Sequence, residues 1–245
     1  DRDKRLARLV HDFKEAYNSS TGVVAIKFPS SRVIPVDETI RPESKVHTFN
    51  QVFSYIDHAE PIAVATCFCR HEAKLLDEKD DCHMPDEVCM QFGVGAEFLI
   101  ERGIGRKVTR EEAKESLKKA AEAGLVHAGL NTQELDFICN CCACHCMILK
   151  SALSQPKPGM ILYSGYQPGV DSDLCTGCEI CVGRCPAKAI TMREGMPESD
   201  PDRCFGCGVC AAGCPMQAIA MVEKPGIPLP PRNRKEMQEV IKAQA

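Results

Sequence analysis

Apolar residues at the start of the chain recur at helical spacing, and the pattern soon changes to alternation. Leu6, Val10 and Phe13 share one face of a helix that we expect over the first twenty residues. Alternation of apolar and polar residues at 23–28 and 32–36 predicts two short strands. The chain therefore opens with a mixture of helix and strand.

Two capping boxes predict where further helices begin. Thr48 is followed three residues later by Gln51, and Thr109 is followed by Glu112. At this spacing each side chain can accept a hydrogen bond from the backbone N–H of the other residue. The first helix is expected to run to about His58, and the second to about residue 123.

Glycine and apolar runs divide the rest of the N-terminal two-thirds. Gly124 is placed to end the second capped helix, and Gly103 to end a helix that we expect over 85–102. The apolar run IAVAT at 62–66 predicts a buried strand. Shorter strand patterns lie at 125–127 and 137–139. These elements together predict an α/β arrangement with a small core.

Cysteine is the outlier of the composition, with 17 of 245 residues. Many cysteines lie two or three residues apart, which suits a metal centre better than a disulfide, because disulfide geometry needs well-separated Cα atoms. The charged first residues do not resemble a signal peptide. No apolar run approaches the about 18–20 residues of a membrane-spanning helix. We therefore expect a protein of a reducing, cytoplasmic and anaerobic setting, without a membrane span.

An internal repeat occupies the C-terminal part. Residues 171–192 align with 200–221 without a gap, and each half contains the run CxxCxxCxxxCP. In this run three cysteines hold one [4Fe–4S] cluster and the fourth serves the other cluster. The segment resembles the bacterial 2[4Fe–4S] ferredoxin family. The predicted ligands are Cys175, Cys178, Cys181 and Cys214 for one cluster, and Cys204, Cys207, Cys210 and Cys185 for the other.

Two further features support iron–sulfur clusters in the repeat. Gly177 and Gly206 occupy equivalent positions where the backbone passes close to a cluster, so we expect positive φ angles there. Zinc is disfavoured, because zinc sites use two CxxC pairs and not two interlocking quartets.

Nine further cysteines precede the repeat and predict at least one more metal site. Two additional four-cysteine [4Fe–4S] clusters would use eight of them, the two sequence groups could interleave, and zinc could replace one cluster. Cys89, between Val88 and Met90, could instead be a packing residue. The candidate ligands are Cys67, Cys69, Cys82, Cys89, Cys139, Cys141, Cys142, Cys144 and Cys146.

The order of the motifs ATCFCRHEAKL, CMQFG, GLVH and ICNCCACHC before a ferredoxin domain resembles a family of 4Fe–4S dicluster-domain proteins of anaerobic bacteria and archaea. The resemblance covers roughly residues 34–224 and implies iron–sulfur binding and redox work, without a substrate. The family pattern carries a further cysteine near His145. This histidine is therefore either a substituted ligand or a bystander. His71 and His83 are more simply solvated, and His127 a packing residue.

These observations predict an α+β chain of three parts. They are an N-terminal α/β Cys-rich domain at 1–165, a dicluster ferredoxin domain at 166–224, and a Pro-rich linker with a short helix at 225–245. The helix carries Met237 and Ile241 on one face, which suits packing on its own chain as well as on a partner.

The net charge of −4 gives no support to a nucleic-acid binder. The chain also lacks a phosphate-binding glycine loop and a flavin fingerprint. We interpret it as an iron–sulfur electron-transfer protein, and more readily as the electron-transfer subunit of an oxidoreductase complex than as an independent enzyme. Its partner would be a redox protein such as a flavoprotein or a metal-dependent oxidoreductase. The alternatives are an oxidoreductase with an N-terminal catalytic cluster, and a redox sensor.

Overall fold

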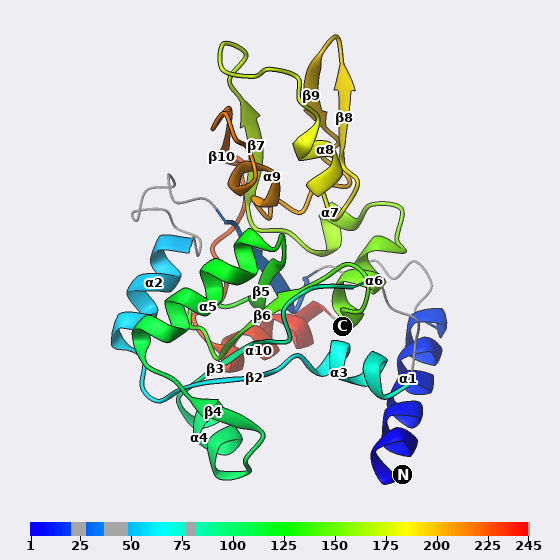
Figure 1. Cartoon of the computed structure of the whole chain (residues 1–245), viewed down its shortest axis with the longest axis vertical. Coiled ribbons are helices and arrows are strands. Elements are labelled where there is room, and N and C mark those ends of the chain that lie inside the picture. Colours follow the sequence, from blue (N-terminus) through cyan, green and yellow to red (C-terminus); the bar gives the residue numbers. More distant parts are fainter. Residues whose placement is uncertain (21–27, 37–48, 77–81, 245) are drawn as a thin grey trace.

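The computed structural model describes residues 1–20, 28–36, 49–76 and 82–244. The predicted strand at 23–28 and the capping residue Thr48 lie outside this part of the chain, apart from residue 28 itself. Helices and strands are mixed throughout, so the chain is α+β, as predicted (Figure 1). No described helix combines the length and the apolar composition that crossing a bilayer requires.

A six-stranded sheet forms the centre of the N-terminal part, in the order β1-β5-β6-β3-β2-β4. Every neighbouring pair is antiparallel. The strands are β1 (Ser31–Ile34), β2 (Ile62–Thr66), β3 (Glu87–Phe92), β4 (Gly105–Lys107), β5 (Val126–Leu130) and β6 (Phe137–Cys141).

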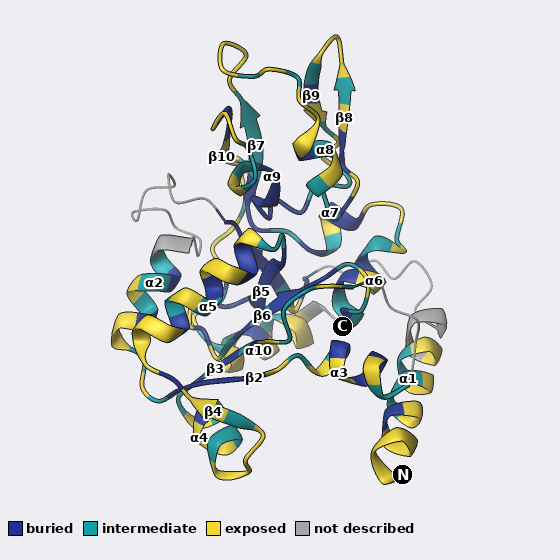
Figure 2. Ribbon diagram, viewed as in Figure 1, coloured by how far each residue is buried: buried dark blue, intermediate teal, exposed yellow. Residues whose placement is uncertain are grey.

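Helices pack around this sheet and bury its central strands, which are dark in Figure 2. Helix α5 contacts β2, β3 and β5, and it packs against α2. Their shared core includes Ile56, Leu117, Val64, Met90 and Ile138, all at most 3% exposed. The helices of this part are α1 (Arg2–Ser20), α2 (Phe49–His58), α3 (Phe68–Leu75), α4 (Val94–Glu101), α5 (Arg110–Glu122), α6 (Met147–Leu153) and α7 (Pro158–Ile161).

Several predicted boundaries are confirmed. Helix α2 ends at His58 and β2 covers the run IAVAT. Helix α5 has the predicted capping box: the Glu112 N–H donates to Thr109 Oγ1 at 3.1 Å, and the Thr109 N–H donates to Glu112 Oε2 at 2.8 Å. Gly124 follows the helix with a φ of +83°.

The helix predicted over 85–102 is wrong in its first half. Val88, Met90 and Phe92 are buried in alternation along β3, which is the period of a strand. Pairing with β2 and β6 on both sides fixes this conformation. Gly93, with a φ of +54°, then turns the chain into α4.

The repeat forms the upper part of Figure 1. Two antiparallel pairs, β7 with β10 and β8 with β9, enclose two short helices. The elements are β7 (Tyr166–Val170), α8 (Ile180–Arg184), β8 (Ile190–Arg193), β9 (Met196–Ser199), α9 (Val209–Ala212) and β10 (Ile219–Glu223).

The repeat and the N-terminal part share one hydrophobic core. Val126 and Leu149 from the N-terminal part pack in one cluster with Phe205 and Val209 of the repeat. The backbone N–H of Val36, just after β1, donates to the Cys207 carbonyl at 2.9 Å. The two parts are therefore packed together without a linker between them.

The C-terminal tail packs on its own chain. The backbone N–H of Gln133 donates to the Pro231 carbonyl at 2.8 Å, and Arg234 forms an ion pair with Asp136 at 3.1 Å. In α10 (Arg234–Gln244), Met237 is buried. Helix α10 therefore packs on its own chain through Met237, while Ile241 on the same face is 37% exposed.

Candidate metal centres

The first predicted quartet lines one cavity. Cys175, Cys178, Cys181 and Cys214 line the same partly open pocket. Its other walls are apolar and include Met192, Pro197 and Ile219. Cys214 comes from the second half of the repeat, so the cavity joins the two halves in the predicted crossover.

The second quartet is gathered in the same way, with Cys185 as the residue that crosses over. Cys185 interacts electrostatically with Cys204, Cys207 and Cys210. Burial raises the pKa of Cys207 well above its usual value and that of Cys210 to about 12. Thiols packed in this way become thiolates only with a cation among them, which is what iron supplies to such a donor set.

Backbone N–H groups point at cysteine sulfurs in both halves. Ala189 N–H donates to Cys185 Sγ and Ala218 N–H donates to Cys214 Sγ, each at 3.3 Å. Such donors stabilise negative charge on cluster ligands and tune the reduction potential. Gly177 and Gly206 have φ angles of +67° and +70°, so the predicted left-handed positions are confirmed.

The nine N-terminal cysteines divide into two groups. The larger one, called the six-cysteine group below, forms a closed ring in which each thiol interacts with the next. In ring order it contains Cys67, Cys69, Cys146, Cys141, Cys139 and Cys89.

Strand ends and strand pairing bring the six-cysteine group together. Cys67 precedes α3, directly after β2, and Cys146 precedes α6. Cys89 in β3 pairs with Ala65 in β2. Cys139 and Cys141 lie two residues apart in β6, so both side chains leave the same face of the strand.

Contacts within the ring shift the pKa values of neighbouring cysteines in opposite directions. Cys141 donates toward its neighbours Cys139 and Cys146, and these contacts raise the pKa of Cys141. The same contacts, together with those from Cys89 and Cys69, lower the pKa of Cys139 well below its usual value and that of Cys146 to about 4. The shifts run in opposite directions in neighbouring residues because the sulfurs lie close together, and a buried set of convergent thiols fits a cationic iron centre.

The smaller group contains the other three cysteines and a histidine. The ligand atoms of Cys82, Cys142, Cys144 and His145 all lie within 4.8 Å of one another. Cys82 comes from the segment before β3, and the other three from the turn between β6 and α6. The two groups therefore interleave along the chain. His145 lies with the cysteines, whereas His127 is buried and hydrogen-bonded to Asn140, as a packing residue would be.

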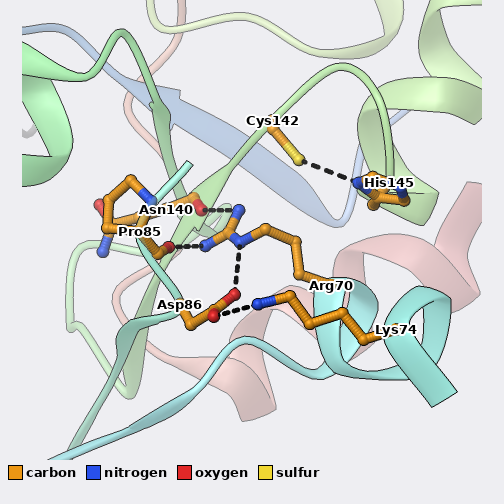
Figure 3. A network of polar contacts seen from close by, with 7 residues as sticks. All are labelled: Arg70, Lys74, Pro85, Asp86, Asn140, Cys142 and His145. Atoms are coloured by element: carbon orange, nitrogen blue, oxygen red, sulfur yellow. Dashed lines mark hydrogen bonds and ion pairs between the residues drawn. The ribbon is translucent and has the colours of Figure 1, made fainter. Parts of the chain in front are cut away.

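Arg70 lies close to both groups and was not among the residues predicted from the sequence. Figure 3 shows its guanidinium beside Pro85, Asp86 and Asn140. Arg70 is 1% exposed. Its guanidinium donates to the Pro85 carbonyl at 2.7 Å and to the Asn140 carbonyl at 3.4 Å, and it interacts with Cys67, Cys82 and Cys142. Its position directly after Cys67-Phe68-Cys69 was the available signal, since a buried cation beside clustered thiols offsets their negative charge.

A polar cleft reaches one edge of both groups. It is lined by Cys69 and His145 together with Lys14, Glu72 and Lys150. Glu72 is 4% exposed and forms ion pairs with Lys14 and, at 3.7 Å, with His11.

Comparison with known families identifies the repeat. Residues 167–215 match the family model of the 4Fe-4S dicluster domain, a range that includes both quartets. This segment is therefore a 4Fe–4S dicluster domain, as the cysteine spacing predicted. No curated protein matches the chain, so the resemblance to proteins of anaerobes rests on the sequence motifs alone.

Proposed function

We propose that this chain is an electron-transfer protein, or the electron-transfer subunit of an oxidoreductase complex, that connects an external redox partner with the six-cysteine group. The first and second quartets would each hold one [4Fe–4S] cluster, and the six-cysteine group a further iron–sulfur centre. Clusters of this kind supply one-electron oxidation and reduction. A reducing, cytoplasmic and anaerobic setting belongs to the same proposal.

One observation carries the proposal: the sulfur sites are packed in an unbroken series. Cys181 of the first quartet and Cys210 of the second share one hydrophobic cluster. Cys207 of the second quartet shares another with Cys141 and Cys146 of the six-cysteine group. Protein atoms without intervening bulk water therefore join the three sites.

The chain's own residues would insulate the inner sites. Phe205 and Val209 are each 1% exposed and pack beside Cys207. By excluding water they lower the local dielectric constant, which disfavours the added negative charge of the reduced state. They would therefore lower the reduction potential of the centre that the thiols bind. The N–H groups that donate to Cys185 and Cys214 act in the opposite direction, because they stabilise added negative charge.

The outer end of the series is suited to a redox partner such as a flavoprotein or a metal-dependent oxidoreductase. Cys178 is exposed. Around the first quartet, Ile180 and Met216 are 42% and 44% exposed, and Leu174 is 47% exposed. An exposed apolar rim around a partly exposed redox site is typical of a transient docking surface.

Metal analysis of the whole protein, purified without oxygen, tests the cluster content. We expect more than eight irons and an equivalent amount of sulfide per chain: eight in the quartets and the remainder in the six-cysteine group. Cys89→Ser should remove iron from the six-cysteine group and leave the eight irons of the quartets in place. Iron that stays at eight or fewer in the unaltered protein would contradict the third centre, and fewer than about four would contradict the proposal as a whole.

Stopped-flow reduction by a chemically reduced flavodoxin tests the outer end. Ile180→Glu places a charge on the rim and should slow electron transfer while leaving the iron content unchanged. Leu229→Glu is the matched control, because Leu229 is 53% exposed and lies in the tail. Equal rates in the two variants would show that electrons enter elsewhere.

A second candidate function is favoured by the polar cleft. Lys14 and Lys150 beside Cys69 could hold a small anionic substrate against the six-cysteine group, and buried Glu72 could exchange a proton with it. Repeated turnover of a small anionic metabolite by the isolated protein, lost in Glu72→Gln with iron retained, would favour this oxidoreductase over the relay.

A further inference from the structure

We propose that Cys82, Cys142, Cys144 and His145 bind a single zinc ion, and that this ion fixes the turn that presents the six-cysteine group. The site lies outside the dicluster domain and shares no ligand with the electron-transfer series. Its role would be structural, because four protein ligands leave no open coordination position.

The spacing of the donor atoms fits one ion. In a tetrahedral site with Zn–S bonds of about 2.3 Å, two sulfurs on one zinc lie about 3.8 Å apart. The four ligand atoms here lie within 4.8 Å of one another, so a contraction of about 1 Å would bring them onto one ion. The Cys142 Sγ to His145 Nδ1 distance is 3.9 Å. A tetrahedral ion with Zn–N of about 2.0–2.1 Å would place this sulfur and nitrogen about 3.6 Å apart.

The chemistry of the donors also selects zinc over a cluster. Three thiolates with one imidazole form one of the usual ligand sets of structural zinc. A [4Fe–4S] cube binds each cysteine through a different iron, so its ligands converge less closely on one point. Cys82, Cys142 and Cys144 instead interact with each other at close range.

The surrounding charge is balanced for such an ion. On binding, each of the three thiols loses its proton to solvent, so three thiolates around Zn²⁺ leave one negative charge. The guanidinium of Arg70 donates to Cys142 and provides the compensating positive charge. Arg70 is held in place by carbonyls of Pro85 and Asn140 and by Asp86, whose carboxylate lies 3.8 Å from Arg70 Nε (Figure 3).

The position of the ligands explains what the ion would do. Cys142, Cys144 and His145 lie in the turn between β6 and α6. Cys141 and Cys146, the two most buried members of the six-cysteine group, stand directly before and after these ligands. The ion would thus close the turn and attach it to the segment that contains Cys82. This would hold the six thiols in their relative positions.

Zinc X-ray absorption on the full-length protein, produced anaerobically with added zinc, tests the site. We expect about one zinc per chain, with three sulfurs at about 2.3 Å and one nitrogen at about 2.0–2.1 Å. His145→Cys should keep the zinc and convert the shell to four sulfurs. His145→Ala should weaken zinc binding, measured by chelator competition, by at least about 100-fold, since loss of an outer partner alone costs about 10- to 100-fold.

Two controls separate this site from its neighbours. His83 is exposed and adjoins Cys82, and His83→Ala should leave zinc binding unchanged. Cys89→Ser should remove iron and keep zinc, so a failure of the electron-transfer proposal would appear in the iron count alone. If the zinc ligand shell of His145→Cys is the same as that of the unaltered protein, the inference is overturned. A zinc-free protein that loses about four irons in Cys144→Ser would overturn it as well, in favour of a fourth cluster.

Discussion

Replacing Gly206 with alanine tests how closely the second half of the repeat packs against the residues that precede the repeat. Gly206 has a φ of +70°, and a Cβ atom there would lie 2.1 Å from the Tyr166 carbonyl oxygen and 2.5 Å from Ser164 Oγ. Gly177 occupies the equivalent position in the first half, with a φ of +67°. Its Cβ would meet only the Gly195 carbonyl oxygen, at 3.0 Å. The pair is therefore a matched experiment in one protein.

The expected cost follows from these contacts. A left-handed conformation costs an alanine about 1–2 kcal/mol at either position. At Gly206 the overlap adds about 1–3 kcal/mol, because the neighbouring backbone is held: Ser164 N–H donates to the Phe205 carbonyl at 3.0 Å, and Ser164 Oγ–H donates to the Gly206 carbonyl at 2.6 Å. Tyr166 is also only 1% exposed. The total is about 2–5 kcal/mol for Gly206→Ala and about 1–2 kcal/mol for Gly177→Ala.

Thermal unfolding of the anaerobic protein at one heating rate measures the difference. A change of about 1 kcal/mol moves the midpoint by about 2–4 °C in a chain of this size. Gly206→Ala should therefore unfold about 2–12 °C below Gly177→Ala, when both circular dichroism and visible cluster absorbance are followed. Equal midpoints, or a lower one for Gly177→Ala, would refute the packing argument.

Three further predictions concern the N-terminal cap of α5, a buried histidine and the crossover of the quartets. Thr109→Ala removes the cap that Glu112 completes and should lower the free energy of unfolding by about 1 kcal/mol; an unchanged thermal midpoint would contradict it. Burial lowers the pKa of His127 to about 4, below its unfolded value of about 6.5. The unfolded chain then binds the proton first, so stability is complete above about pH 6.5 and falls as the pH drops towards 4. His127→Gln should flatten that part of the stability curve, and an unchanged slope would speak against the assignment. Cys185→Ala should damage the cluster of the second quartet and spare that of the first, which electron paramagnetic resonance of the reduced protein can distinguish; damage confined to the first quartet would exclude the crossover.

The elements that the sequence predicted well are those whose signals are local. The capping box of α5 and the glycine that follows it depend on neighbouring residues only, and so does the spacing of the repeated cysteines. β3 was missed because its short apolar alternation runs directly into the helical residues of α4. Hydrogen bonding to β2 and β6 decides its conformation, and those partners are distant in the sequence.

The division of the nine N-terminal cysteines depends on the order of strands in the sheet and could not be predicted from spacing. Cys89 reaches Cys67 because β3 pairs with β2, and it reaches Cys139 because β3 also pairs with β6. A sheet with another strand order would group the same residues differently. The site that Cys82 joins could not be predicted from spacing either, because its other ligands lie in a turn about sixty residues further along the chain.

The segment 139–146 can serve two sites because its backbone changes from strand to turn midway. In β6, Cys139 and Cys141 face the six-cysteine group, while Asn140 points away from them. Asn140 is buried and hydrogen-bonds to His127 and to the Val88 carbonyl, so the opposite face of the strand is satisfied without a metal. The strand ends at Cys141, and the turn that follows redirects the next ligands to the proposed zinc ion. Two four-cysteine clusters would leave one of the nine cysteines unused, whereas a ring of six and a group of three that His145 completes include all nine.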